Sequence, residues 1–180
     1  MNRKSDNTNY GTVAVTIHWV SAIAIVGLLI SGFSAGQVPD PQTKAAILRL
    51  HAPLGIVIAI LTLARIVWWW RYDTRPAPTG GSPAWQERAA RAVHLLFYVV
   101  ILGMAASGIG MFILSGAGLV LFGGSQSALP DFHDYLPRIP HGIGARAMTA
   151  LFVIHAGAAL YHHFVKRDAT LKRMWFAKPG

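Results

Sequence analysis

Four long apolar segments, separated by shorter polar stretches, dominate the pattern of residues along the chain. We place them near residues 12–35, 46–70, 90–115 and 141–165. About 20 apolar residues in a helix are enough to cross the hydrocarbon core of a bilayer, so each segment predicts one membrane-spanning helix. The pattern therefore predicts an all-α integral membrane protein, a four-helix bundle that forms a single domain over residues 1–180.

The composition and the connections agree with a membrane protein. Hydrophobic residues make up 53% of the chain and charged residues only 13%, against roughly 25% charge in a soluble domain. The connection over residues 71–88 is rich in proline, glycine and charge, which is typical of an interfacial loop. The connection over residues 116–140 mixes apolar residues with prolines and has room for a short surface helix. The chain has no cysteine, which excludes disulfides and covalent c-type haem attachment.

Basic residues predict the orientation of the bundle. Four spans place both termini on one side of the membrane, and twelve of the 16 Lys and Arg residues lie on that side. This asymmetry predicts cytoplasmic termini. The net charge of +9 then favours anionic lipid headgroups as partners. Nucleic acid is a poor alternative, because the basic residues flank spans and form no separate module. The basic residues on the opposite side are Lys44, Arg49, Arg138 and Arg146.

Histidines are the candidate chemistry of the spans. Each predicted span contains at least one, and ionisable residues at membrane depth are by default functional candidates. Since 14 residues of helix advance about 21 Å and return to nearly the same face, His141 and His155 share one stripe of the last span. The eight histidines are His18, His51, His94, His133, His141, His155, His162 and His163.

The other spans supply histidines at matching depths. His51 is level with His141 near the outer face, whereas His18 and His94 are both level with His155 near the inner face. Two stacked pairs of imidazoles match what two haems with histidine axial ligands require. At this point either His18 or His94 could be the partner of His155.

Arg65 is a second informative residue inside a span. It lies 14 residues after His51, on the same helix face but at the inner leaflet. Its side chain could extend to the lipid headgroups. It could equally meet the propionates of an inner haem through charge-assisted hydrogen bonds.

Three stretches carry a resemblance to a known family. "TIHW" at 16–19, "RLHAPLGI" at 49–56 and "IHAGAALYHHFVKRDATLKRM" at 154–174 resemble the prokaryotic cytochrome b561 family, and more loosely the cytochrome b subunits of formate dehydrogenases and hydrogenases. The resemblance implies a four-helix bundle of the bacterial inner membrane that encloses two stacked b haems. It pairs His18 with His155 and His51 with His141, and makes His94 a near-haem or quinone-side residue.

The resemblance also implies an activity. Family members move electrons between a periplasmic donor and ubiquinone, and at least one oxidises superoxide, so a superoxide:ubiquinone oxidoreductase is the leading interpretation. An electron-carrying subunit that serves a periplasmic dehydrogenase or a soluble cytochrome, as a redox partner protein, is the alternative. A haem-free, histidine-lined transporter is disfavoured, because cysteines are absent and acidic residues are almost absent from the spans.

Two further predictions concern the ends of the electron path. His162 lies seven residues beyond His155 on the same face, and we expect it to donate a hydrogen bond to a ubiquinone carbonyl or else to face headgroups. Lys44, Arg49 and Arg138 lie just before the outer histidines, where their charge would attract superoxide. For the two remaining histidines we expect no cofactor: His133 is a solvated loop residue, and His163 faces headgroups.

Overall fold

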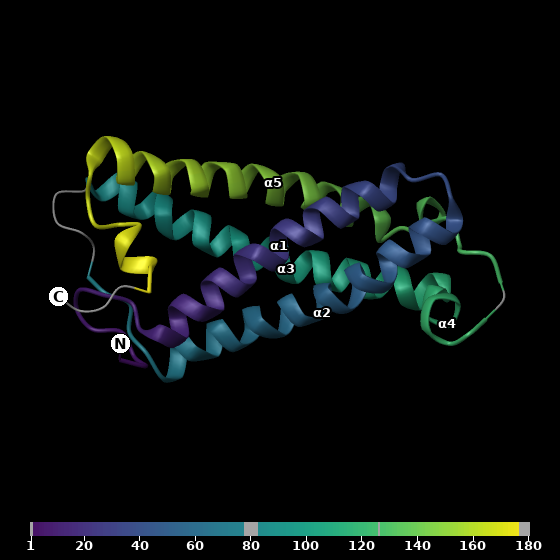
Figure 1. Cartoon of the computed structure of the whole chain (residues 1–180), viewed down its shortest axis with the longest axis horizontal. Coiled ribbons are helices and arrows are strands. Elements are labelled where there is room, and N and C mark those ends of the chain that lie inside the picture. The colour runs from purple at the N-terminus through teal and green to yellow at the C-terminus, as the bar shows by residue number, and fades with distance from the viewer. Residues whose placement is uncertain (1, 78–82, 126, 177–180) are drawn as a thin grey trace.

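The structure of the chain, a computed structural model, describes residues 2–77, 83–125 and 127–176. Within these ranges every regular element is a helix and there is no strand (Figure 1). The elements are α1 (Thr12–Gln37), α2 (Pro41–Arg71), α3 (Ala84–Ser115), α4 (Ala117–Phe122), η1 (Phe132–Asp134), α5 (Arg138–Tyr161), η2 (His162–Lys166) and η3 (Lys172–Met174).

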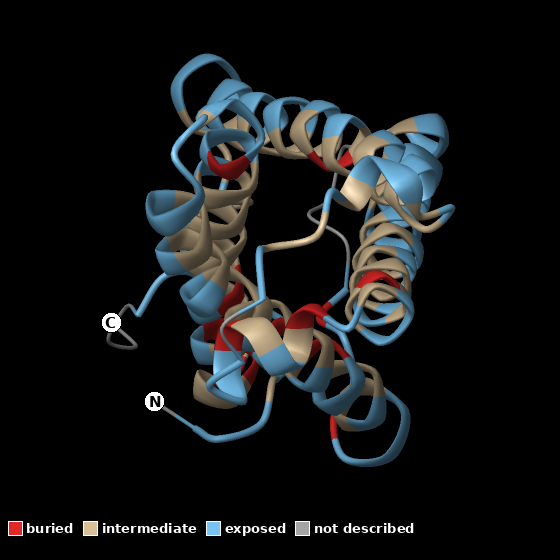
Figure 2. Cartoon of the chain, turned by 90° about the vertical axis from the view of Figure 1, so that its right-hand side faces the viewer, coloured by how far each residue is buried: buried red, intermediate tan, exposed pale blue. Residues whose placement is uncertain are grey.

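The four long helices form two closely packed pairs, α1 with α2 and α3 with α5, and α2 also lies beside α3. Viewed end on, they stand around one axis (Figure 2). The start of α1 and η3 lie at the same end of the bundle, called the terminal end below. The opposite end carries α4 and is called the α4 end.

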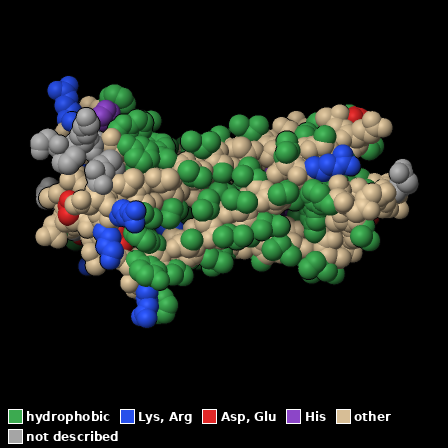
Figure 3. Space-filling model, turned by 60° about the horizontal axis from the view of Figure 1, so that its bottom comes forward, with side chains coloured by type: hydrophobic (Ala, Val, Ile, Leu, Met, Phe, Trp, Pro, Cys, Tyr) green, Lys and Arg blue, Asp and Glu red, His purple; other side chains and the backbone are tan. Residues whose placement is uncertain are grey.

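The outer surface is that of a membrane protein. All four long helices, with α5 continued to Lys166, are long and apolar enough to cross a membrane. Apolar side chains cover the middle of the bundle on the face shown in Figure 3, and basic side chains gather toward its two ends. Large apolar residues such as Ile23 and Ile113 are more than 70% exposed, which is stable in lipid but not in water. The prediction of an all-α, four-helix, multi-pass membrane protein is confirmed.

A tight turn at the α4 end fixes how α1 and α2 pair. Asp40 caps α2: its carboxylate accepts hydrogen bonds from the Thr43 backbone N–H at 2.8 Å and the Thr43 hydroxyl at 2.6 Å. Pro41 follows at the first helical position, where its missing N–H costs nothing. These local signals start α2 so that His51 lies within its first three turns.

Short segments cover both ends of the bundle. At the α4 end, Gly116 directly precedes α4, and its φ of 67° favours glycine. The Nε of Arg49 donates to the Leu121 carbonyl at 2.9 Å. At the terminal end, the chain after α5 turns back, and the Trp19 indole N–H donates to the Met174 carbonyl at 2.7 Å. The segment around η3 therefore lies directly against α1.

Candidate functional site

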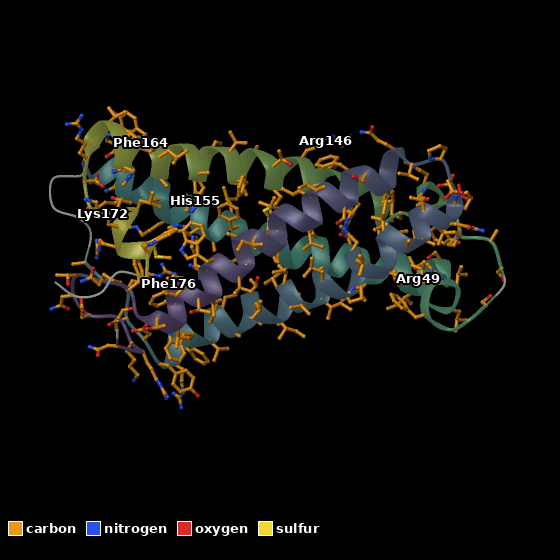
Figure 4. The ribbon with its side chains drawn as sticks, viewed as in Figure 1. Arg49, Arg146, His155, Phe164, Lys172 and Phe176 are labelled. Carbon is orange, nitrogen blue, oxygen red and sulfur yellow. The ribbon has the colours of Figure 1, made fainter. Side chains whose placement is uncertain are left out.

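Two pairs of histidines face each other inside the bundle, one pair toward each end. His51 of α2 and His141 of α5 meet at the α4 end, with ring centres 6.3 Å apart. His18 of α1 and His155 of α5 meet toward the terminal end, with ring centres 6.1 Å apart. His155 points inward from α5 in Figure 4. Each pair joins a helix of the α1–α2 pair to α5, so each spans the axis of the bundle.

The spacing within each pair suits a metal ion held between two imidazoles. Metal–nitrogen bonds to histidine are about 2 Å long, so two rings on opposite sides of one metal have centres about 6 Å apart. Both observed separations, 6.1 Å and 6.3 Å, agree with this value. His94 of α3 is also near His155, but its ring centre is only 5.5 Å away. The spacing thus favours His18 over His94 as the partner of His155.

Hydrogen bonds at the α4 end determine which nitrogen of His141 carries the proton. The Nδ1 atom of His141 lies 3.1 Å from the Met104 carbonyl oxygen, which can only accept a hydrogen bond. It also lies 3.0 Å from the Ser107 hydroxyl, which itself donates to the Met104 carbonyl at 2.9 Å. Nδ1 is therefore the donor, and the lone pair of neutral His141 is on Nε2, as in a metal-binding histidine.

His51 is held in the same way from α1. Its Nδ1 lies 2.9 Å from the hydroxyl of Ser31, and this hydroxyl donates to the Leu28 carbonyl at 3.2 Å. Since the hydroxyl proton is directed at Leu28, the His51 ring donates to the serine oxygen. Both rings of this pair are thus arranged with Nε2 available as a ligand.

The pair toward the terminal end has different surroundings. The Nη1 atom of Arg65 lies 3.4 Å from Nδ1 of His18, and the buried Nε of Arg65 has no hydrogen-bond partner within the described residues. The ring of Phe97 packs edge-on against His155 at 5.5 Å. An arginine with an unsatisfied buried nitrogen beside this pair suits an anionic group, such as a haem carboxylate.

Glycines allow close approach to the two rings at the α4 end. A Cβ atom at Gly32 would lie 3.1 Å from Cε1 of His51, and one at Gly108 would lie 3.4 Å from Cε1 of His141. An alanine methyl group at Gly32 would crowd His51, whereas one at Gly108 would just touch His141, so only side chains larger than alanine would crowd it there. The paired nitrogens, the unsatisfied arginine and the glycines fit a flat, anionic metal cofactor such as haem.

A bare metal ion fits the same residues poorly. In the parts of the chain that the structure describes, no group of three or more His, Asp or Glu side chains could hold a metal ion. Protein sites for bare zinc or other transition metals use three or four such ligands. Two opposed imidazoles instead match a metal whose other positions are filled by a macrocycle.

His162 contacts the chain beyond α5 at the terminal end. Its Nδ1 lies 2.5 Å from Oδ2 of Asp168 and 3.5 Å from the Thr170 hydroxyl. Arg167 adopts a left-handed conformation with φ of 54°, which turns the chain back and brings Asp168 to this position. Partial burial opposes ionisation of Asp168, but hydrogen bonds from His162 and Thr170 lower the pKa of this carboxyl from 3.8 to about 2. Asp168 is therefore a carboxylate at neutral pH.

The three basic residues expected near the outer histidines lie at the α4 end, in different surroundings. Arg49 is tied to α4 through Leu121, as described above, and extends toward that end in Figure 4. Arg138 is half-buried at the start of α5, one turn before His141. Lys44 is half-buried in the first turn of α2, two turns before His51.

Sequence reasoning missed Ser31, Ser107 and Asp168. The two serines are among the few polar residues inside apolar spans, and this rarity is the signal that could have singled them out. Nothing in the spacing assigns them to particular histidines, because the contacts cross between helices. Asp168 was part of a cluster of charges after the last span, and only the fold brings it back to His162.

The fold and the paired imidazoles define a class of protein: a membrane-embedded four-helix bundle built to hold a metal macrocycle. A family model described as prokaryotic cytochrome b561 matches residues 9–177. The chain therefore belongs to the prokaryotic cytochrome b561 family. Membership implies a b-type haem cofactor and electron transfer in the membrane.

Curated relatives match almost end to end. "Cytochrome b561 homolog 1" of Escherichia coli (strain K12) is 28% identical over 169 residues, which cover 92% of this chain and 96% of that protein. "Cytochrome b561 homolog 2" of the same strain is 29% identical, covering 92% and 90%. "Probable superoxide oxidase CybB" of Yersinia pestis is 28% identical, covering 95% and 98%.

Proposed function

We propose that the protein is a superoxide:ubiquinone oxidoreductase of the bacterial inner membrane that carries two b haems. Two superoxide anions each give up one electron and leave as O₂. One ubiquinone takes up these two electrons and two protons and leaves as ubiquinol. The bound haems supply the one-electron redox chemistry, and the chain supplies their spacing, their ligands and access for the two substrates.

The observation that carries this proposal is the presence of two separate pairs of opposed histidines. We assign His51 and His141 to one haem and His18 and His155 to the other, because the ring separations of 6.3 Å and 6.1 Å both suit a shared metal. Two haems in one bundle give electrons a route between the two membrane faces, which a single site would not provide. We assign Arg65 to the carboxylates of the haem at the terminal end, where its Nε has no partner within the described residues.

The distribution of charge supports an orientation. Twelve of the 16 basic residues lie on the side of the termini, so we place the terminal end in the cytoplasm and the α4 end in the periplasm. Superoxide then reaches the α4 end, where Lys44, Arg49 and Arg138 attract the anion. Ubiquinone is reduced near the terminal end, with His162 and His94 on its side of the haem.

The proposal also takes support from a relative. The Yersinia pestis protein of 28% identity is described as a probable superoxide oxidase, and it is matched over 98% of its length. The two Escherichia coli relatives are described only as cytochrome b561 homologs, which leaves the carrier subunit as a second candidate function. In that case a periplasmic dehydrogenase or soluble cytochrome would deliver electrons to the same pair at the α4 end.

Spectroscopy and turnover together test the proposal. The detergent-purified protein should give a dithionite-reduced b-type spectrum and two haems per chain in a pyridine haemochrome assay. It should then oxidise superoxide and reduce a ubiquinone analogue with no other protein added. Two haems without this turnover would identify a carrier subunit, and a protein without haem would leave the transporter interpretation.

A further inference from the structure

An open crevice lies between α2, the residues that follow it and α3, near the terminal end. It has a volume of about 770 Å³, within the range of small-molecule sites. Its apolar part opens sideways toward lipid, since Trp70 is 81% exposed, Leu95 62% and Val99 59%. Ile66 and Leu102 continue the apolar wall toward the middle of the membrane. This part of the crevice suits an aliphatic chain.

The other end of the crevice is polar and carries a positive charge. The guanidinium of Arg75 lies over the ring of Trp69 at 5.6 Å, a cation–π contact that holds it at the mouth. Within the described residues, Arg75 forms no ion pair with an acidic side chain. Tyr98 and Thr74 add hydroxyl groups to the same wall. The free groups here are chiefly hydrogen-bond donors, which suits a ligand rich in acceptor oxygens.

Asp73 also lines the crevice, but its carboxylate is already satisfied. It is 8% exposed and accepts hydrogen bonds from the backbone N–H and hydroxyl of Ser5, at 3.0 and 2.9 Å. The indole N–H of Trp68 donates to it at 3.0 Å and the Thr74 N–H at 2.9 Å. These four donors are uncharged, so Asp73 keeps its negative charge, but its oxygens are occupied and it forms no ion pair with Arg75 within the described residues.

A second, smaller depression adjoins the first and adds to its positive charge. Its volume is about 420 Å³, and it shares Trp69, Trp70, Asp73 and Thr74 with the crevice. Lys4 and Arg71 line it, so three basic residues surround the shared wall. Basic pockets between transmembrane helices at headgroup depth are typical sites for anionic phospholipids.

We propose that the α2–α3 crevice binds an anionic phospholipid, with a phosphate at Arg75 and an acyl chain along Ile66, Leu95, Val99 and Leu102. The charge separates this ligand from ubiquinone. A quinone is neutral and gains only a hydrogen bond from Arg75, whereas a phosphodiester matches the planar fork of the guanidinium in both charge and shape. Lys4 and Arg71, on the adjoining depression, add attraction for a phosphate and little for a quinone.

Lipid binding to the detergent-purified, haem-loaded protein tests this site. Phosphatidylglycerol is titrated in mixed micelles, and bound lipid is counted by native mass spectrometry, with phosphatidylcholine as the zwitterionic comparison. We expect phosphatidylglycerol to bind preferentially and to raise the thermal unfolding temperature. Arg75→Gln should weaken this binding on the order of tenfold, as for loss of a charge-assisted hydrogen bond. Leu102→Trp, which fills the apolar part without a change in charge, should weaken it as well.

The matched control is Arg88→Gln, because Arg88 is exposed on α3 at the same end but does not line the crevice. It makes the same change in net charge and should leave binding unchanged. Equal losses in Arg75→Gln and Arg88→Gln would overturn the proposal, since they would indicate general attraction to a basic surface. Displacement of the bound lipid by a ubiquinone analogue at equal concentration would also overturn it, in favour of a quinone site. If Arg75→Gln is not recovered folded, the test is made with Leu102→Trp, and unchanged phosphatidylglycerol binding in that variant would overturn the proposal.

Discussion

The Nδ1 atom of His141 lies 3.1 Å from the carbonyl oxygen of Met104, a contact in which the imidazole must be the donor. The same nitrogen has the Ser107 hydroxyl as a second neighbour, at 3.0 Å. His51, opposite, has one such partner, the hydroxyl of Ser31. In this proposed haem site, Nδ1 of His141 therefore has two hydrogen-bond partners and Nδ1 of His51 has one.

This asymmetry predicts unequal effects of two similar substitutions. Ser31→Ala removes the Nδ1 partner of His51, whereas Ser107→Ala leaves His141 bonded to the Met104 carbonyl. Loss of such a supporting contact typically costs 10–100-fold in metal affinity. We expect Ser31→Ala to lower haem retention at the α4 end clearly more than Ser107→Ala, measured as haem transfer to apomyoglobin. A larger effect of Ser107→Ala would contradict the assignment of the Met104 carbonyl as the main acceptor.

The choice between His18 and His94 gives the second prediction. The ring separation from His155 is 6.1 Å for His18 and 5.5 Å for His94, and only the former agrees with the pair at the other end. His18→Ala and His155→Ala should each lose one of two b haems, while His94→Ala should keep both with an altered spectrum or slower quinone reduction. A pyridine haemochrome assay measures the number of b haems per chain in each variant. Loss of a haem in His94→Ala, with two retained in His18→Ala, would reverse the assignment.

The sequence was sufficient for the architecture because each span is long, apolar and separated from the next by polar residues. It also predicted that His51 and His141 share one depth and that His18, His94 and His155 share another, since the helical rise converts residue number into depth. The structure brings together the same two groups of residues. Whether they bind haem stays a prediction.

Side-chain contacts between helices could not be predicted from the sequence. Spacing along one helix does not specify how a neighbouring helix is rotated, so Ser31 opposite His51 and Met104 opposite His141 could not be assigned. The same holds for Asp168, whose position depends on the left-handed turn at Arg167, a non-glycine residue without a clear sequence signal for this conformation. The depth of the site residues was therefore predictable from helical rise, whereas their hydrogen-bond partners were not.

Two glycines of α1 provide a matched pair for a third prediction. In Gly32→Ala the new methyl group would lie 3.1 Å from Cε1 of His51, whereas a Cβ at Gly36 meets nothing within 4 Å. Both changes replace a helical glycine with alanine, and this replacement by itself stabilises a helix by about 0.5–1 kcal/mol. We expect Gly32→Ala to disturb the haem at the α4 end, seen as a shifted reduced spectrum or lost haem. Gly36→Ala should keep the parent spectrum, and equal spectra for the two variants would refute the close approach.

Asp168 gives a prediction for pH. Its pKa is lowered from 3.8 to about 2 in the folded protein, so its contribution to stability is present above about pH 4 and is lost as pH falls toward 2. Protonation weakens the contact with His162 and should release the segment after α5. Pepsin cleavage within residues 167–176 should accelerate over this range in the parent. In Asp168→Asn the same sites should already be cleaved quickly at pH 4, with little further change on acidification.

His162 itself separates a role in quinone reduction from a structural one. Asp168→Asn disturbs the same contact but keeps the imidazole, so it is the natural comparison for His162→Ala. If His162 serves ubiquinone, His162→Ala should retain both haems and slow quinone reduction more than Asp168→Asn does. Stopped-flow oxidation of the dithionite-reduced protein by a ubiquinone analogue provides the rates. Equal rates in the two variants would limit His162 to holding the segment after α5.

The last prediction concerns attraction of the donor at the α4 end. Lys44 lies two turns before His51, and Arg138 lies one turn before His141. Within the described residues, neither forms a salt bridge with an acidic side chain. Arg49 is a less suitable position for a test, because its Nε holds the Leu121 carbonyl and its removal would loosen α4. A cationic mouth raises the on-rate of an anion by tenfold or more, an effect that salt weakens.

The double variant Lys44→Gln/Arg138→Gln should therefore slow haem reduction by superoxide by about tenfold at low salt and flatten its dependence on ionic strength. Arg146→Gln is the control, because Arg146 is the remaining basic residue of this end and is exposed on α5, with its Nη1 donating to the Gly142 carbonyl at 3.4 Å. It should change the rate far less than the double variant does. Haem content should stay at the parent level in both proteins. A double variant with the parent's rate and salt dependence would show that superoxide is not guided by these charges, and would favour a protein donor that docks at the α4 end.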